Sequence, residues 1–397
     1  MVAGGGVAGV CAAIAAARCG VRTLLVERER YYGGTGYAGL LEHICGLYLN
    51  GETIPSETLN DGLTREIIEL LAKKSSQKAV KKIGQVYVLP FAAHDLLDVF
   101  DTLLAGEQDL TLLRNTVVTG IEVMREEVRS VIVSAPDGMQ SGIAVSAVVD
   151  CTGNGCVSVW AGAAFELSPP DERQLAGFSI QISGLKGGDD TLPIKVPYYC
   201  AQAVEQGMLP PQMKFTAFNY SDVAGQGFIK MSVDGDDSLE RNALASENAR
   251  LLLAYLGEVL PSFRGAIIKN MALKVLDREG RRIIGDYMLT EKDILAARKF
   301  PDAIVRNAWP IELWDRDRGT LYKYLSRGDH YEIPFRCITV KGINNLLTAG
   351  RCISVSHEAL GSTRVMGTCM ALGEQAGLAA AYYVNNGKYP GTITKLP

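Results

Sequence analysis

Three glycines near the start of the chain and one acidic residue behind them form the spacing with the clearest chemistry. Gly4, Gly6 and Gly9 are followed by Glu27, which ends the apolar run 23–26. In this pattern the first glycine permits a tight strand-to-helix turn, the second lets a pyrophosphate approach the backbone, and the third lets the helix pack closely on its strand. Glu27 stands where a carboxylate accepts hydrogen bonds from ribose hydroxyls and repels a 2′-phosphate. The pattern predicts a site for the ADP half of FAD or NAD, and disfavours NADP.

A second pair of residues that could take part in catalysis, His357 and Arg364, lies near the other end of the chain. Histidine exchanges protons near neutral pH, and arginine binds a carboxylate through two parallel hydrogen bonds. We expect a loop that carries both residues, in which His357 can transfer a proton and Arg364 can bind a substrate anion. The alternative is structural: His357 caps a turn and Arg364 pairs with Glu358.

The elements that must position these residues are a short strand, a helix over 8–19 and a strand over 23–26. The helix would present free N–H groups to a phosphate at its N-terminus. Only residues 1–3 precede the glycines, so the first strand is short.

Beyond them, the periodicity predicts polar-surface helices within 57–84 and an amphipathic helix over 94–104. It predicts strands at 85–89, 111–114, 120–125, 130–134, 143–145 and 147–150, and we interpret those after 110 as a β-meander that ends at residues 151–153.

Residues 166–335 have a different texture, with strands over 178–182 and 228–233 and a helix over 239–256. From residue 345 a buried strand ending at Gly350, a loop and a helix over 366–384 resume the first pattern. We therefore predict an α/β chain with a discontinuous, Rossmann-like FAD-binding domain that contains a β-meander (1–165 and 336–397). An α+β substrate domain (166–335) is inserted into it.

Bulk composition narrows the function classes. The net charge of −4 argues against nucleic acid as a partner, and no apolar run is long enough to span a membrane. The apolar N-terminus lacks a signal peptide's positive region, so we expect a cytoplasmic protein. The nine cysteines and four histidines lack the spacing of a metal site, and none is predicted. Cys151 and Cys156 are either a redox pair or, as we favour, small buried residues.

With these motifs assembled, the chain resembles the bacterial FAD-dependent oxidoreductases of the glutathione-reductase-like two-dinucleotide-binding fold. It is also distantly similar to the fumarate reductase and succinate dehydrogenase flavoproteins. The resemblance rests on the opening glycines with Glu27, and on the segments 33–35, 149–153, 282–287, 345–357 and 364–377. It implies a non-covalent FAD whose ribityl chain lies along Gly350 and Arg351. Backbone N–H groups near Val365, Met366 and Gly367 would face the flavin ring.

The full set of expected cofactor residues is Gly4, Gly6, Val7, Ala8, Gly9, Glu27, Arg28, Gly34, Thr35, Val118, Thr152, Gly153, Gly350, Arg351, Val365, Met366 and Gly367. The expected catalytic residues are His357 and Arg364, with Arg282 and Arg336 as weaker candidates. In the fumarate-reductase relatives an acid usually follows the ribityl glycine; here Arg351 stands there and would place positive charge near the cofactor.

The favoured function is hydride transfer between a small polar or anionic metabolite and flavin N5. A non-catalytic or electron-relay flavoprotein subunit is one alternative, motivated by the short first strand and by Arg351. An NAD-dependent dehydrogenase is another, although it would continue with further βαβ units after Glu27. Only one glycine fingerprint occurs, so electrons would pass to a diffusing acceptor or a partner protein; a homo-oligomer stays open.

Overall fold

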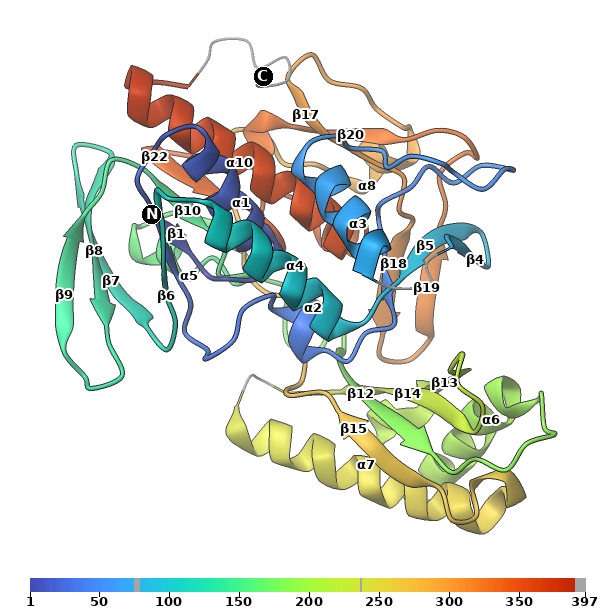
Figure 1. The fold of residues 1–397 in the computed structure, drawn as a ribbon. Coiled ribbons are helices and arrows are strands. Elements are labelled where there is room, and N and C mark those ends of the chain that lie inside the picture. Colours follow the sequence, from blue (N-terminus) through green and yellow to red (C-terminus); the bar gives the residue numbers. More distant parts are fainter. Residues whose placement is uncertain (75–78, 236–237, 390–397) are drawn as a thin grey trace.

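A six-stranded sheet lies at the centre of the computed structural model, which describes residues 1–74, 79–235 and 238–389 (Figure 1). Its strand order is β21 (Thr339–Val340), β22 (Ile343–Thr348), β10 (Val148–Asp150), β1 (Val2–Ala3), β2 (Thr23–Val26) and β6 (Leu110–Leu113). All neighbours run parallel except β21, which is antiparallel to β22. Helices cover parallel sheets on both faces, which explains why these strands are short apolar runs. The predicted α/β class is confirmed.

Two helices from opposite ends of the sequence cross beside this sheet: α1 (Val7–Arg18) and α10 (Met366–Asn386) (Figure 1). A side chain at Gly373 would overlap the carbonyl oxygen of Ala8, so the absence of one lets the two backbones touch. The first body, defined as the described chain outside 176–275, also contains α2 (Thr35–Ala38), α3 (Leu63–Lys74), α4 (Ala93–Gly106), α5 (Cys156–Trp160), α8 (Glu291–Leu295), α9 (His357–Thr363) and the 3₁₀ turn η3 (Phe335–Cys337).

The β-meander is smaller than the sequence predicts. It consists of β7 (Val117–Met124), β8 (Glu127–Ser134) and β9 (Gln140–Ala144), which pair antiparallel. The predicted strands at 111–114 and 147–150 correspond to β6 and β10 and belong to the central sheet. Local periodicity cannot distinguish these two roles, because a strand's partner is chosen by tertiary packing.

Four small sheets complete the first body: β3 (His43–Ile44) with β5 (Val86–Pro90) and β4 (Lys81–Ile83), β11 (Phe165–Glu166) with β16 (Arg282–Ile283), β17 (Ala303–Asn307) with β20 (Tyr331–Pro334), and β18 (Ile311–Asp315) with β19 (Gly319–Lys323). The helical prediction for 57–84 is wrong at its end. Residues 81–83 form a strand because they pair with β5 across a turn at Gly84. Residues 75–78 lie outside the described part.

The second body spans residues 176–275 and has its own hydrophobic core. Its antiparallel sheet has the order β13 (Ala217–Tyr220), β14 (Gln226–Val233), β12 (Ala176–Ser183) and β15 (Ile267–Met271). The helices α6 (Leu192–Glu205) and α7 (Leu239–Val259) pack against it, with the 3₁₀ turns η1 (Pro211–Phe215) and η2 (Pro261–Phe263). Residues such as Leu289 and Tyr331 contribute to the core of the first body. The domain limits 166 and 335 stay a prediction.

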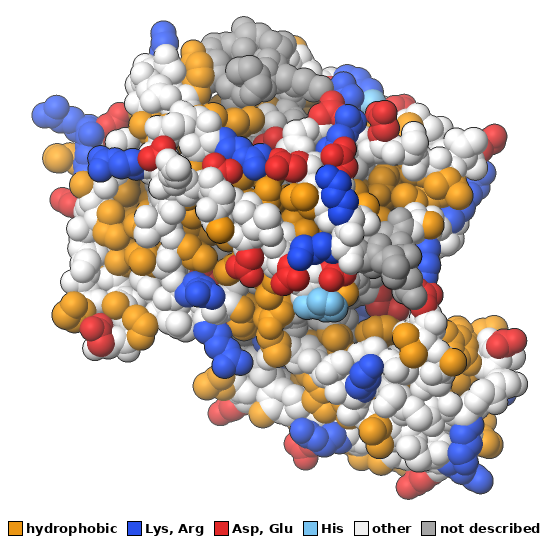
Figure 2. Space-filling model, in the orientation of Figure 1, with side chains coloured by type: hydrophobic (Ala, Val, Ile, Leu, Met, Phe, Trp, Pro, Cys, Tyr) orange, Lys and Arg blue, Asp and Glu red, His pale blue; other side chains and the backbone are white. Residues whose placement is uncertain are grey.

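The second body is set off below the first, with charged side chains on both sides of the junction (Figure 2). Among the described helices, none is both long and apolar enough to cross a bilayer.

Candidate active site

A cavity of about 610 Å³ lies where the carboxyl ends of the central strands face the second body. The residues that follow β1, β2, β10 and β22 line it, namely Gly4, Glu27, Cys151 and Ala349. This is the edge at which open parallel sheets bind ligands. One end of the cavity contains the glycines near α1, and the other contains charged and aromatic side chains from both bodies.

The glycine end has the shape that the sequence predicts. Gly4 adopts φ +97°, and a side chain there would approach within 2.5 Å of the Cys151 carbonyl oxygen. A side chain at Gly9 would overlap the oxygen of Gly4. By contrast, nothing lies within 4 Å of where Gly6 would carry a side chain, so its backbone is open to the cavity. Helix α1 has no side-chain cap, which leaves the first-turn N–H groups to face a ligand.

Glu27 lies at the rim of this end and is only 8% exposed. Its carboxylate accepts hydrogen bonds from Gly5 N at 2.6 Å and from Glu29 N at 2.8 Å. These two contacts fix the carboxylate and leave further acceptor positions directed at the cavity. Glu27 can therefore accept hydrogen bonds from a ribose.

All of the expected cofactor residues line the cavity except Gly9 and Gly367. The absence of Gly9 from the lining follows from its packing against Gly4. Gly367 differs from the expectation because its N–H donates to Cys45 O at 2.9 Å. At the start of α10, Val365 and Met366 line the cavity.

Arg351 lines the cavity but is held by backbone carbonyls. Its Nε donates to Gly153 O at 2.9 Å, and its Nη1 donates to Asp277 O at 2.6 Å and Glu279 O at 3.0 Å. The guanidinium thus connects the loop after β10 with the segment that returns from the second body. It places positive charge beside the cavity, as expected.

The far end of the cavity contains Lys230, Arg278 and Arg364 together with Glu312 and Trp314. The Lys230 Nζ lies 4.2 Å and the Arg278 guanidinium carbon 3.7 Å from the centre of the Trp314 ring. Burial, reinforced by the Arg278 charge, lowers the pKa of Lys230 to about 8. Burial also lowers the pKa of Arg278 to about 9 and lowers the pKa of Arg364.

Arg364 is the only expected catalytic residue among the described residues that line this cavity. Its Nη2 donates to Gln174 Oε1 at 3.3 Å and to Glu312 O at 3.1 Å. The pairing with Glu358 is not what holds it, because Glu358 accepts a hydrogen bond from Ser356 Oγ.

The sequence analysis did not single out Lys230, Arg278, Glu312 or Trp314. The signal for Lys230 was a cation within the apolar strand 228–233, but the residue's orientation depends on the second body.

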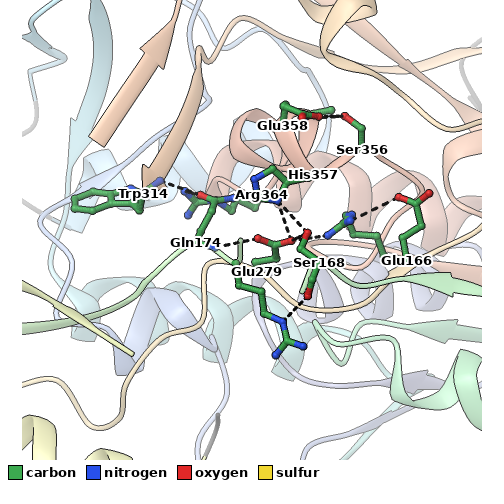
Figure 3. A network of polar contacts seen from close by, with 12 residues as sticks. Glu166, Ser168, Gln174, Glu279, Trp314, Ser356, His357, Glu358 and Arg364 are labelled. Carbon is green, nitrogen blue, oxygen red and sulfur yellow. Dashed lines mark hydrogen bonds and ion pairs between the residues drawn. The ribbon is translucent and has the colours of Figure 1, made fainter. Parts of the chain in front are cut away.

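His357 lies outside the cavity lining, in a neighbouring polar network (Figure 3). The predicted loop at 357–364 is a helix, α9, because Ser356 Oγ accepts a hydrogen bond from Ala359 N at 3.3 Å and starts it. His357 Nδ1 lies 3.0 Å from Glu279 Oε1 and 3.1 Å from Ser168 Oγ. The hydrogen bond with Glu279 raises the pKa of His357. Burial opposes the shift at Glu279, but bonds from His357 and Ser168 bring the pKa of Glu279 to about 2.

The same network reaches Arg364 indirectly. Glu279 Oε2 accepts a hydrogen bond from Gln174 N at 3.1 Å, and Gln174 Oε1 accepts one from Arg364. His357, Glu279, Gln174 and Arg364 are therefore linked in that order, as Figure 3 shows.

The weaker candidates lie elsewhere. Arg282 is buried, and its Nη1 donates to Glu279 Oε1 at 2.6 Å. Arg336 pairs with Asp302 at 2.9 Å. Neither residue is among those that line the cavity within the described chain.

Other groups at the far end are Glu42 and His43, which also line the cavity. Burial raises the pKa of Glu42 to about 7 and lowers the pKa of His43 to about 4. No cluster of candidate metal ligands occurs among residues 1–74, 79–235 and 238–389. Cys151 and Cys156 are both free thiols, and burial raises the pKa of Cys151.

A family model described as FAD dependent oxidoreductase matches residues 1–395. No curated protein matches the chain. BexE, solved in a study of oxidation during BE-7585A biosynthesis, is 15% identical to this chain with a TM-score of 0.50. The match covers 96% of this chain and 61% of the BexE chain. AlpK is 13% identical with a TM-score of 0.50, covering 99% and 64%. A geranylgeranyl bacteriochlorophyll reductase-like protein from Thermoplasma acidophilum is 12% identical with a TM-score of 0.49, covering 98% and 79%.

Proposed function

Since the chain belongs to the FAD-dependent oxidoreductase family, we propose that it transfers a hydride between a small polar or anionic metabolite and N5 of a non-covalently bound FAD. The observation that carries this proposal is the guanidinium of Arg364 in the same cavity as the opening glycines. Family membership already selects FAD over NAD as the cofactor and an enzyme over a passive subunit. The substrate class and the hydride step are what we add.

The residues present fit FAD. The open backbone at Gly6 and the first-turn N–H groups of α1 suit the pyrophosphate, and Glu27 suits the ribose hydroxyls. Val365 and Met366, at the uncapped start of α10, suit the ring edge that becomes negative on reduction. When bound, FAD supplies the two-electron chemistry at N5.

The chain's own residues would bind and orient the substrate. Arg364 presents a guanidinium that Gln174 and the Glu312 carbonyl hold in place. The proton-transferring role of His357 stays a prediction, and its place in the network supports a more limited role. His357 would orient Arg364 through Glu279 and Gln174.

We also propose that the electrons leave to a diffusing acceptor or a partner protein. The support for this is the single glycine fingerprint in the sequence, which provides for one dinucleotide. The second body would cover the substrate and select among metabolites, because Lys230 and Ser179 extend from it into the cavity lining.

The test is anaerobic reduction of the purified, FAD-loaded protein by candidate metabolites, followed as bleaching of the flavin absorbance. A substrate identified in this way should have a KM at least about tenfold higher with Arg364→Ala, because a charge-assisted hydrogen bond is lost. FAD content should be unchanged. If the variant turned over the substrate with the native KM, Arg364 would not bind it, and if flavin bleached only with NADH or NADPH, the proposed donor class would be wrong.

A further inference from the structure

Three cations from distant parts of the sequence meet at the far end of the cavity. Lys230 comes from β14 of the second body, Arg278 from the segment that returns from that body, and Arg364 from the turn after α9. Glu312, on β18, is a carboxylate whose charge raises the pKa of each of the three cations and so opposes the effect of burial. The cluster therefore has more positive than negative charge in a place where water is largely excluded.

Glu312 is already occupied by other donors. Its carboxylate oxygens accept hydrogen bonds from Trp314 Nε1 at 3.0 Å, Trp309 Nε1 at 3.3 Å and Tyr322 OH at 3.4 Å. Although burial alone would raise the pKa of Glu312, the surrounding cations keep that pKa below its usual range. Glu312 is thus an ionised structural anchor, and its single charge cannot balance three cations.

Several donors of the three cations have no partner. Arg278 Nη2 and Arg364 Nε are buried without a hydrogen-bond acceptor among the described residues, and Lys230 Nζ lies over the Trp314 ring. Arg278 is only 6% exposed, and its Nη1 donates to the Leu175 carbonyl. Buried charged groups without acceptors are costly, so such groups in a cavity indicate a bound anion.

We propose that Lys230, Arg278 and Arg364 together bind the carboxylates of an organic anion, with a dianion preferred over a monoanion. The proposal rests on the proposed function, because it specifies the substrate of the same cavity. Three cations face Glu312 and Glu42, and burial raises the pKa of Glu42 to about 7, so the cluster keeps a net positive charge near neutral pH. A dicarboxylate neutralises this charge more fully than a monocarboxylate does. Trp314 keeps Lys230 and Arg278 in position through its ring face.

The arrangement makes the site dependent on both bodies. Arg364 and Arg278 belong to the first body, whereas Lys230 lies on β14 of the second. An anion between them would bridge the two. The second body thereby contributes one direct ligand, Lys230, as well as a cover for the cavity.

The experiment is a titration of the FAD-loaded protein with malonate, acetate and the uncharged malonamide, followed by calorimetry and by the visible spectrum of the bound flavin. We expect malonate to bind more tightly than acetate and malonamide not to bind. At pH 8.5 malonate should bring about proton uptake, measured in buffers of different ionisation enthalpy, because the anion favours the charged form of Lys230.

Lys230→Met should weaken malonate binding by roughly 10- to 100-fold and reduce the proton uptake to what Arg278 and Glu42 contribute, while FAD content stays native. Arg278→Lys, which keeps the charge but loses the planar fork, should weaken it less. Lys186→Met, at an exposed lysine of the same body, is the matched control and should bind as the native protein does.

Native-like malonate affinity in Lys230→Met, or equal affinity for malonamide, would overturn the proposal. So would a Lys230→Met variant that changes only FAD affinity, since the cations would then serve the cofactor. These results are independent of turnover. Failure of every metabolite to bleach the flavin would count against the hydride transfer, whereas malonate binding would still be measured.

Discussion

At the residue scale, Glu27 shows how one carboxylate can be fixed for a ligand before the ligand arrives. Its contacts with Gly5 N and Glu29 N hold it at the cavity rim without using all of its acceptor positions. The residues at the far end differ, because Arg278 and Arg364 have buried donors for which the described residues provide no acceptor. At the glycine end the protein itself fixes the carboxylate of Glu27. At the far end, in our proposal, a bound anion supplies the acceptors that the protein lacks.

We expect Glu27→Gln to weaken FAD binding by roughly 10- to 100-fold, because a charged acceptor for the ribose becomes a neutral one. The measurement is the dissociation constant from quenching of FAD fluorescence. Glu205→Gln, at an exposed site of α6, is the control and should bind FAD normally. Unchanged affinity in Glu27→Gln would mean that the ribose is held elsewhere.

His357 should make stability depend on pH. The bond to Glu279 raises the pKa of His357 in the folded chain above the ordinary value of about 6.5. The native state therefore binds the proton more tightly, so this stabilisation is complete below the unfolded pKa. It is lost as the pH rises through the folded pKa.

The free energy of unfolding in urea should accordingly differ more between the native protein and His357→Gln at pH 6 than at pH 9. A constant difference between native and His357→Gln across this range would contradict the pairing with Glu279.

At the element scale, the crossing of α1 and α10 determines where both ends of the ligand lie. The start of α1 faces the glycine end of the cavity, and the start of α10 faces it through Val365 and Met366. Gly373 and Gly377 lie against the backbone of Ala8 and Ala12, which leaves no room for larger residues. Helix α10, near the end of the described chain, therefore positions helix α1, near its start.

Gly373→Ala should lower the free energy of unfolding by about 1–3 kcal/mol, because the added methyl group forces the helices apart. FAD binding should weaken with it, since both helix starts move. Gly106→Ala, at the end of α4 where no atom lies within 4 Å, is the control. Its stability should be unchanged or slightly higher. Equal unfolding midpoints for the two variants would show that the close approach is unimportant.

At the scale of the whole molecule, two bodies with separate hydrophobic cores share one cavity. Arg351 is a direct link across this arrangement, because it binds the carbonyls of Gly153 on one side and of Asp277 and Glu279 on the other. An acid at this position would not make these contacts. The departure from the fumarate-reductase relatives thus corresponds to a connection between the loop after β10 and the returning segment.

Arg351→Ala should lower the free energy of unfolding by about 2–4 kcal/mol, because three carbonyl groups lose a charged donor. Proteolysis near residues 277–279 should become faster. Arg250→Ala, on the exposed face of α7, is the control and should leave both properties unchanged. Native stability in Arg351→Ala would indicate that packing alone joins these segments.

The sequence by itself determined the local chemistry of the first end. The spacing of Gly4, Gly6 and Gly9 and the position of Glu27 depend on backbone geometry within one strand–helix–strand unit, so they could be predicted without knowledge of the rest. The apolar strands and the long helices were also predictable, because burial on a sheet or helix face leaves a period in the sequence.

Only the tertiary structure decided which side chains meet at the second end. Lys230, Arg278 and Arg364 share no local pattern, and their meeting depends on how the second body docks against the first. His357 was expected at the cavity from the resemblance of its loop to that of related flavoproteins, yet α9 directs it to Glu279. Local spacing determines which groups a turn or helix exposes. The packing of the two bodies determines which other groups these contact.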